Sequence, residues 1–262
     1  MKKLILIGLL SSGLLASTSI KSDTPSLKEK VDSLTTEQVE RIGVAYSVGK
    51  TIKANDGKTF ETTLPSIAGV ESYWGSVSVG DKYDKNGRLK HLFDSSLGDY
   101  QIKMDTARLT IKDNKVLFEK YKDLIYDGER VKYDTFLSNI RAISKYSKII
   151  AETKTKGDSK SIKDYNFAKQ QLSKCVELHN EYSKKIATDS KLANKLLNDH
   201  KFSAEIAGNY LKDMYNIALA RNYKNLYKRA VGRYNGGWSN MNYANAVVDN
   251  LGVVSKTVKT KL

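Results

Sequence analysis

The 262-residue chain contains very little cysteine and histidine. Its one cysteine, Cys175, has no partner for an internal disulfide. Its three histidines, His91, His179 and His200, lie far apart in the sequence, and none has a companion at the short spacing typical of a zinc site. We therefore expect no metal-dependent catalysis.

Proline and strand-forming segments are also scarce. The chain has two prolines and few runs of the aliphatic residues that strands favour, whereas Lys, Leu, Ala and Asn are abundant. Hydrophobic residues make up 40% of the chain and charged residues 28%, which is a globular composition. The expected fold is mainly α, and the length favours one or two domains.

A long apolar run is found only at the N-terminus. Lys2 and Lys3 precede apolar residues 4–15, and small residues follow at 16–19. This order is typical of a secretory signal peptide, and the run is short for a bilayer span. An uncleaved anchor and a buried N-terminal helix are the alternatives. We expect residues 1–19 to be a signal peptide and the protein to be exported to the periplasm or cell wall.

Acidic residues are too few to balance the basic ones. The net charge is +15, and it would be +13 after removal of Lys2 and Lys3 with the signal peptide. Such a charge attracts polyanions, but the lysines are spread along the chain as on solvated helices. No nucleic-acid-binding motif accompanies them, so we expect no nucleic-acid partner. An exported basic protein would instead meet anionic wall polymers or a membrane surface.

The first elements can be placed from their end signals. Residues 20–34 are polar, and we expect a flexible lead-in there. A helix is expected over about 35–52, because Thr35 and Gln38 have the spacing of a capping box. Pro65 fits the first turn of the next helix, where its missing N–H matters least.

The next segment, 75–98, has short alternating runs around Asn86-Gly87, a pair that predicts a tight turn in a small β-ribbon. Its acidic residues lack the spacing and the final glutamate of a calcium loop. Residues 110–200 have apolar pairs at helical spacing and predict a helical hairpin or a small bundle, in which we find no chemistry.

Glu71 is the titratable residue with the least polar setting. It ends an apolar helical stripe and is followed by Tyr73 and Trp74. Desolvation there would raise the pKa of the carboxyl and keep its proton for donation. A surface glutamate at a helix end explains this segment alone equally well. Trp74 and Trp238 fit either the wall of a groove or the core.

Five short segments follow one another in an informative order: LPSIAGVES (64–72), SLGDYQIK (96–103), HKFSAEIAGNYL (200–211), AVGRYNGG (230–237) and NYANAVV (242–248). This series resembles the catalytic domain of the lysozyme-like lytic transglycosylases, which cleave bacterial peptidoglycan. The match covers about residues 60–108 and 198–250. It departs from the family pattern at Asp99-Tyr100, which replaces an apolar pair, and at Arg233, which replaces a small residue.

The resemblance implies a lysozyme-like domain of the α+β type with a small β-hairpin flap. Its first half would span residues 35–108 and its second half residues 200–262. Residues 109–199 would then form a long helical insertion between the two halves.

The resemblance also implies an activity, that of a peptidoglycan lytic transglycosylase. Glu71 would protonate the β-1,4 glycosidic oxygen between MurNAc and GlcNAc. It would then take the proton of the sugar's 6-hydroxyl, which closes a 1,6-anhydro ring. This mechanism needs no outside water and therefore no metal or other cofactor. Glycosidases normally use two carboxylates, but none of Asp94, Asp99 and Asp105, which flank the glutamine element, shares the apolar setting of Glu71.

The resemblance assigns supporting roles to six further residues, which would bind substrate: Ser72, Tyr100, Gln101, Tyr234, Asn235 and Tyr243. Tyr234 would hydrogen-bond Glu71. Asn235 and Gln101 have donors and acceptors suited to the N-acetyl group and ring hydroxyls. Ser72 would steady the acid or the acetamido group, and the other two tyrosines would stack or hydrogen-bond along the glycan. Core packing near a helix end is the alternative for Tyr234 and Tyr243.

Two alternatives remain open at this point. A goose-type lysozyme would use the same acid but hydrolyse the bond with water, and the lack of an evident second carboxylate favours ring closure instead. A non-catalytic cell-wall binding protein is the other alternative. The expected partners are peptidoglycan glycan strands, while association with envelope or secretion machinery and the oligomeric state stay open.

Overall fold

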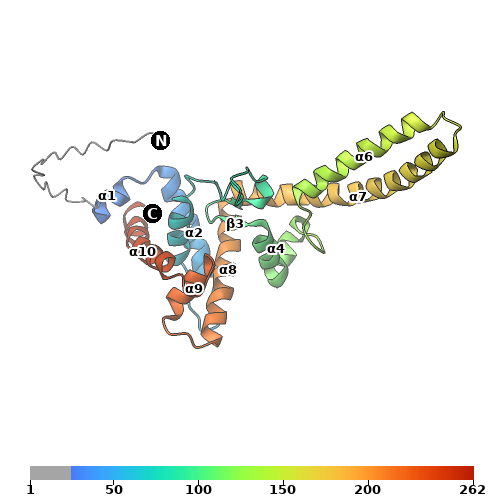
Figure 1. Cartoon of the computed structure of the whole chain (residues 1–262). Coiled ribbons are helices and arrows are strands. Elements are labelled where there is room, and N and C mark those ends of the chain that lie inside the picture. The colour runs from blue at the N-terminus through green and yellow to red at the C-terminus, as the bar shows by residue number, and fades with distance from the viewer. Residues whose placement is uncertain (1–24) are drawn as a thin grey trace, which may run out of the picture.

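The computed structural model describes residues 25–262, so the expected signal peptide at 1–19 lies outside the described residues. The chain is mainly helical with one three-stranded antiparallel sheet, which confirms the mainly α prediction. A helical body carries one long helical arm (Figure 1). Within residues 25–262, no helix is both long and apolar enough to cross a membrane. The α-helices are α1 (Leu27–Asp32), α2 (Thr36–Thr51), α3 (Thr63–Ser72), α4 (Met104–Asp113), α5 (Lys115–Tyr121), α6 (Tyr133–Thr153), α7 (Ser159–Asn198), α8 (His200–Ala220), α9 (Leu226–Tyr234) and α10 (Met241–Lys261).

Helix α1 lies where we expected a flexible lead-in, so that expectation is wrong for residues 27–32. A capping box between Ser26 and Glu29 begins the helix. Val31 is buried, and Lys261 Nζ of α10 donates to the Val31 carbonyl at 2.7 Å. Two local hydrogen bonds and one buried side chain are therefore enough to order this segment against α10.

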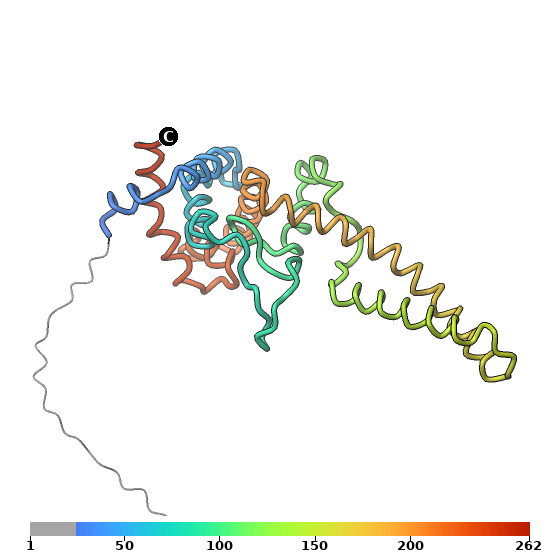
Figure 2. Tube along the Cα trace, turned by 90° about the horizontal axis from the view of Figure 1, so that it is seen from above, coloured from blue at the N-terminus to red at the C-terminus, as the bar shows by residue number. Residues whose placement is uncertain are grey.

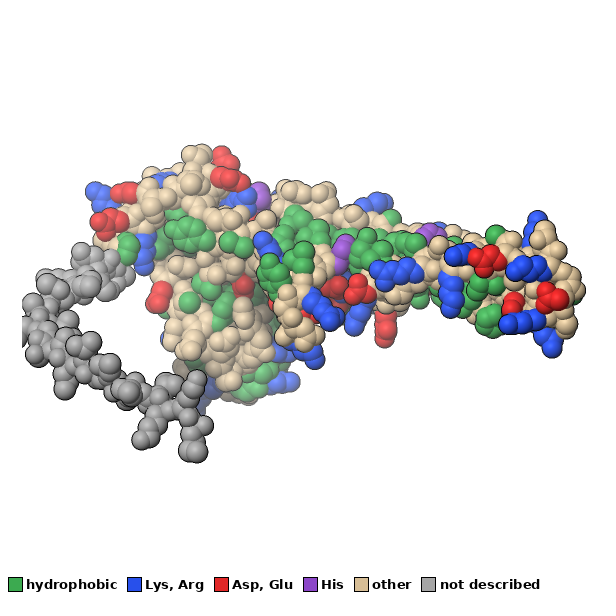
Figure 3. All heavy atoms as spheres, turned by 45° about the horizontal axis from the view of Figure 1, so that its top comes forward, with side chains coloured by type: hydrophobic (Ala, Val, Ile, Leu, Met, Phe, Trp, Pro, Cys, Tyr) green, Lys and Arg blue, Asp and Glu red, His purple; other side chains and the backbone are tan. Residues whose placement is uncertain are grey.

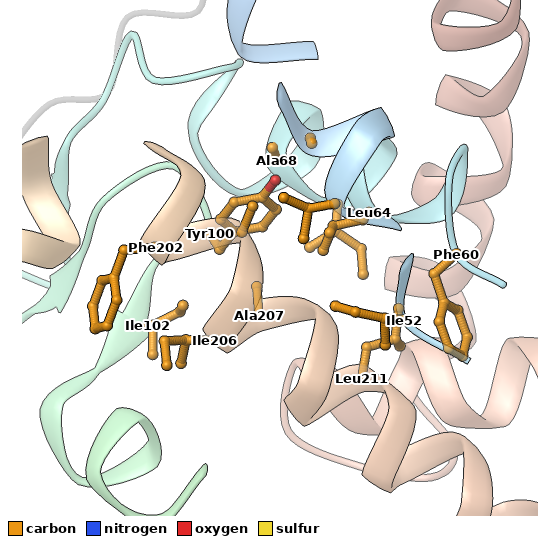
Figure 4. Packing of buried hydrophobic residues seen from close by; sticks show 14 of the residues in the cluster. Ile52, Phe60, Leu64, Ala68, Tyr100, Ile102, Phe202, Ile206, Ala207 and Leu211 are labelled. Atoms are coloured by element: carbon orange, nitrogen blue, oxygen red, sulfur yellow. The ribbon is translucent and has the colours of Figure 1, made fainter. Parts of the chain in front are cut away.

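The body is built around α3, whose residues 63–69 are all buried. Helices α2, α8 and α10 pack against it. Leu64 and Ala68 of α3 belong to one core cluster with Ile52, Tyr100 and Leu211, and Ala68 lies on the Tyr100 side of it (Figure 4). Both expected helix starts are confirmed, because Thr35 and Gln38 form a reciprocal capping box on α2 and Pro65 lies in the first turn of α3.

A small sheet lies beside α3 and consists of β1 (Val79–Gly80), β2 (Ser96–Leu97) and β3 (Ile102–Lys103). β2 pairs with both neighbours in antiparallel register. The turn from β2 to β3, residues 98–101, uses positive φ at Gly98 (+71°) and Gln101 (+49°). A Cβ on Gly98 would lie 2.1 Å from the Leu196 carbonyl oxygen, so only glycine fits there against α7.

The segment between β1 and β2 projects from the body (Figure 2). A bridge between Tyr83 and Leu89 closes it, and Gly87 has φ +75°. The Asp84 carboxylate accepts from the N–H groups of Asn86 (2.8 Å) and Arg88 (2.9 Å). The predicted tight turn at Asn86-Gly87 is confirmed.

Helices α6 and α7 form the arm, a long antiparallel hairpin that projects from the body (Figures 1 and 2). The arm begins at Tyr133 and not at residue 109, because the segment before it belongs to the body. Leu117, Tyr121 and Leu124 of that segment are buried in the body core. The inner end of α7 also enters this core through Leu196.

Candidate active site

Glu71 lies in the last turn of α3, at the edge of a cavity of about 600 Å³. The floor and walls come from the small sheet, the 98–101 turn, the first turn of α4, the middle of α8 and the C-terminal end of α9. The lining residues are Glu71, Gly80, Asp81, Ser96, Gln101, Ile102, Lys103, Thr106, Tyr210, Tyr234, Asn235 and Gly236. The elements that contribute them are far apart in the chain, so the cavity exists only in the folded body.

Glu71 holds its place through two donors to the same oxygen. Its Oε1 accepts from the Tyr243 hydroxyl at 2.7 Å and from Asn235 Nδ2 at 3.0 Å. Burial raises the pKa of Glu71 above its ordinary value, and the two hydrogen bonds oppose the shift without cancelling it. The direction is the one that the sequence predicts. A carboxyl of this kind can act as a proton donor.

Asn240 connects the two donors and was missed by the sequence analysis. It is the N-cap of α10, and its Oδ1 accepts from Tyr243 N at 3.3 Å. Its Nδ2 donates to the Asn235 carbonyl at 2.7 Å. One side chain thereby sets the spacing between the donors of Glu71. An asparagine just before an apolar helix was the available signal, as Asn is a preferred N-cap.

Tyr234 does not bond to Glu71, so the expected contact is wrong. Its hydroxyl donates to the Tyr100 carbonyl at 3.2 Å, while its ring lines the cavity next to Tyr210. Burial, then the nearby Glu71 carboxylate, raises the pKa of Tyr234 well above its ordinary value, so the hydroxyl remains a donor. The tyrosine that holds the acid is Tyr243.

Tyr100 and Ser72, which we expected to bind substrate, are buried and do not line the cavity. Tyr100 is only 2% exposed and lies in the core beside Ala68 (Figure 4). Ser72 is buried, and its hydroxyl donates to the Asp99 carbonyl at 2.7 Å and accepts from Gly75 N. Both residues hold the 98–101 turn against α3, which is a positioning role.

Gln101 does reach the cavity, as expected. Its side-chain Nε2 donates to the carbonyls of Val77 (2.9 Å) and Gly98 (3.0 Å). Its Oε1 lies over Gly80, where a Cβ would approach it to 1.9 Å. The amide donors are thus used by the backbone, and the oxygen is the group left to accept a hydrogen bond from a ligand.

Asp99, which departs from the family pattern, has a structural role. It is 4% exposed and pairs with Arg41 Nη1 at 2.5 Å and with His200 Nδ1 at 3.0 Å. These contacts tie the 98–101 turn to α2 and to the start of α8. The buried charge is compensated, and the turn that carries Gln101 is fixed from behind.

A second carboxylate in the cavity, Asp81, was also missed. It follows β1 with φ +51° and pairs with Lys90 at 2.7 Å and Lys103 at 3.7 Å. The bond to Lys90 lowers the pKa of Asp81, whereas burial raises that of Glu71, so the two carboxyls of the cavity are shifted in opposite directions. Asp94 and Asp105, which the sequence analysis considered and set aside, both pair with Arg130 outside the cavity.

The cavity continues along the body and is not a closed pocket. A neighbouring cavity of about 560 Å³ shares Thr106 and Tyr210 with it and extends between α4 and α8. Neither tryptophan forms its wall. Trp74 is in the core, where its Nε1 donates to the Pro65 carbonyl, and Trp238 packs on Tyr223. The shape suits an extended ligand.

The chain was compared with protein-family models, with curated proteins and with solved structures, and none of the three comparisons finds a match. The functional assignment therefore depends on the order of the sequence motifs and on the geometry around Glu71.

Proposed function

We propose that the protein is a glycan-cleaving enzyme with a lysozyme-like catalytic domain, and specifically a peptidoglycan lytic transglycosylase. The observation that carries this proposal is Glu71 itself. It is a largely buried carboxyl with a raised pKa, held by two donors, at the edge of an elongated cavity. The motif order supports the same substrate, and export through residues 1–19 would bring the enzyme to the peptidoglycan.

The first step is proton donation to the leaving group. Tyr243 and Asn235 both occupy Oε1 of Glu71, so Oε2 is the oxygen free to carry the proton. Glu71 transfers that proton to the glycosidic oxygen, and the C–O bond breaks. The acetamido group of the sugar stabilises the positive charge that develops at its anomeric carbon.

The second step uses the ionised Glu71 as a base. Glu71 takes the proton of the sugar's 6-hydroxyl, the oxygen attacks the anomeric carbon, and the 1,6-anhydro ring closes. The acid ends with its proton restored, and no water is consumed. The donors on Oε1 stabilise the carboxylate between the two steps.

Hydrolysis by the same acid is the second candidate, and Asp81 is the observation that favours it. An ionised carboxylate in the cavity of a protonated one is the pairing that inverting glycosidases use to activate a water. The two reactions differ in their products. Anhydro products are lighter than hydrolysed ones by one water, about 18 Da.

Mass spectrometry of digested, purified peptidoglycan tests both candidates with matched variants. Glu71→Gln should lower turnover by about 10²-fold or more, because Gln keeps the hydrogen bonds but has no proton to transfer. Asp81→Asn should leave anhydro products and most of the rate. The hydrolase would be favoured if the parent protein released reducing-end products and Asp81→Asn lost activity. Full activity of Glu71→Gln would contradict any enzymatic role for this site.

A further inference from the structure

The arm has a surface that the proposed catalysis does not use. With residues 25–262 considered, Asn139 is the one fully buried residue of α6, and the outer part of α7 (159–188) buries only Ser161 and Ala168. A hairpin that buries so little adds little to the stability of the body. Its length, about 60 Å for the 40 residues of α7, instead carries its tip far from the cavity.

Positive charge is concentrated on the outer half of the arm, residues 141–174. This segment has nine Lys and Arg residues against three Asp and Glu residues, a net charge of +6. Residues 25–262 have 41 against 28, a net charge of +13, so nearly half of the excess lies in 34 residues. All nine basic side chains are exposed, and in the described chain only Lys148 has a carboxylate within 4 Å, that of Glu152 at 3.8 Å.

Hydrophobic side chains lie exposed among these charges, as the green and blue atoms along the arm show (Figure 3). On α7, Lys160, Phe167 and Lys174 recur every seven residues and therefore lie on one side of the helix. Phe167 is 57% exposed, and Leu178, four residues beyond Lys174, is 42% exposed. We define the Phe167 face as Tyr146, Lys160, Lys163, Phe167, Lys174 and Leu178.

The ring of Phe167 is already oriented by the other helix. It packs edge-on against Tyr146 of α6, with 6.3 Å between the ring centroids. Lys145 Nζ lies 5.7 Å from the Tyr146 ring. The Phe167 face therefore combines aromatic, aliphatic and ammonium groups, and its apolar area stays in water unless something covers it.

We propose that the Phe167 face binds the surface of an anionic lipid bilayer. Lysines attract acidic headgroups, and exposed aromatic and aliphatic side chains enter the boundary between headgroups and acyl chains. A second copy of the chain fits less well, because two segments of net charge +6 repel each other. A soluble polyanion would neutralise the lysines but leave the exposed Phe167 and Leu178 without a partner.

Vesicle co-sedimentation of the full chain tests this proposal, with phosphatidylcholine vesicles prepared with and without phosphatidylglycerol. Binding is expected only to the anionic vesicles and should weaken with salt. Lys160→Glu/Lys163→Glu/Lys174→Glu should weaken it by about 100-fold, and Phe167→Ala by about tenfold. Circular dichroism checks that each variant is folded.

Two controls make the assignment specific. Lys58→Glu/Lys224→Glu/Lys259→Glu makes the same charge change at exposed positions of the body and should leave binding within about twofold. Ile162→Ala removes an equally exposed apolar group (49%) from another side of α7 and should also have little effect.

Four outcomes would overturn the proposal. The first is equal binding to neutral and anionic vesicles, and the second is an equal loss of vesicle affinity in the arm and body triple variants. The third is a loss of vesicle affinity in Ile162→Ala as large as that in Phe167→Ala. The fourth is an unchanged vesicle affinity of Phe167→Ala together with binding of the chain to soluble polyphosphate. The last would indicate a binder of soluble polyanions. Peptidoglycan turnover, measured in parallel, is independent of these results, so failure here and failure of the proposed catalysis are distinguishable.

Discussion

At the scale of single residues, the site is a balance between desolvation and hydrogen bonding at one carboxyl. Burial raises the pKa of Glu71, and the hydrogen bonds from Asn235 and Tyr243 lower it in part. Proposed proton donation needs the protonated form, so the rate should fall as pH rises through the pKa of Glu71. The alkaline limb of the pH profile therefore reports the environment of this one group.

Tyr243→Phe should move that alkaline limb to higher pH. The variant removes a hydrogen bond that favours the ionised carboxylate, so the pKa of Glu71 rises further. The measurement is kcat/KM against pH on purified peptidoglycan. Tyr234→Phe is the matched control, since its hydroxyl bonds to the Tyr100 carbonyl and its loss should leave the limb in place. A limb that moves to lower pH in Tyr243→Phe would contradict this account.

Glu71→Gln should stabilise the protein at neutral pH. Because the folded pKa of Glu71 is raised above its ordinary value of 4.5, the native state keeps a proton that the unfolded chain releases. Stability is therefore lost as pH rises from about 4.5 through the folded value, and Gln does not suffer that loss. We expect a gain of about 0.5–2 kcal/mol in the free energy of unfolding at pH 7.

Urea unfolding of both proteins at pH 4 and pH 7 measures this difference. The gain should shrink at pH 4, where Glu71 is mostly protonated in the folded and unfolded states alike. The difference in the free energy of unfolding between Glu71→Gln and the parent should thus be larger at pH 7 than at pH 4. If it is smaller at pH 7, burial does not raise the pKa of Glu71.

At the scale of elements, short irregular segments decide the geometry of the site. The 98–101 turn is held by Ser72 of α3, by Arg41 of α2 and by His200 of α8. The N-cap Asn240 of α10 likewise fixes the segment after α9. Helices provide the frame, and their ends and connecting turns place the side chains that face the cavity.

Gly98→Ala should be strongly destabilising, because it would place a Cβ 2.1 Å from the Leu196 carbonyl and requires φ +71°. We expect a loss of about 3 kcal/mol or more in urea unfolding. Gly87→Ala is the control, since φ is also positive (+75°) but no atom lies within 4 Å of the added Cβ. Its cost should be near that of the backbone conformation alone, about 1 kcal/mol. Equal losses would show that the approach of α7 to the turn is unimportant.

At the scale of the whole molecule, the outer arm is structurally separate from the body that holds the core and the cavity. The hydrophobic core is formed by the body and by the inner end of α7. The cavity with Glu71 also lies in the body. The outer arm contributes charge and exposed apolar groups, and it shares no lining residue with the cavity.

Replacing residues 141–174 by a short glycine-rich turn should therefore leave the body folded. The join is favourable because Asn139 Nδ2 donates to the Cys175 carbonyl at 2.9 Å, so the two helices already lie together there. Turnover of a soluble glycan fragment should stay within about twofold, while binding to anionic vesicles is lost. Loss of turnover with an intact circular dichroism spectrum would show that the arm takes part in catalysis.

Much of the site could be predicted from the sequence, and the errors have a common cause. Glu71, Gln101 and Asn235 do line one cavity. The contact of Glu71 was assigned to the wrong tyrosine, and Tyr100 was placed beside the glycan although it is buried. Adjacent residues in a turn with positive φ point in different directions, and no sequence pattern states which of them faces the cavity.

The sequence by itself determined the mainly helical character, the capping box of α2, the turn at Asn86-Gly87 and the presence of an acid in an apolar segment, because these depend on residues a few positions apart. Only the tertiary structure decided which groups meet that acid. Asn235 and Tyr243 lie 164 and 172 positions from Glu71, and their contacts exist because α10 packs against α3 and α9 packs against α10. Such contacts are set by how whole helices fill the core, and the same packing brought Asp81 into the cavity and left the arm outside it.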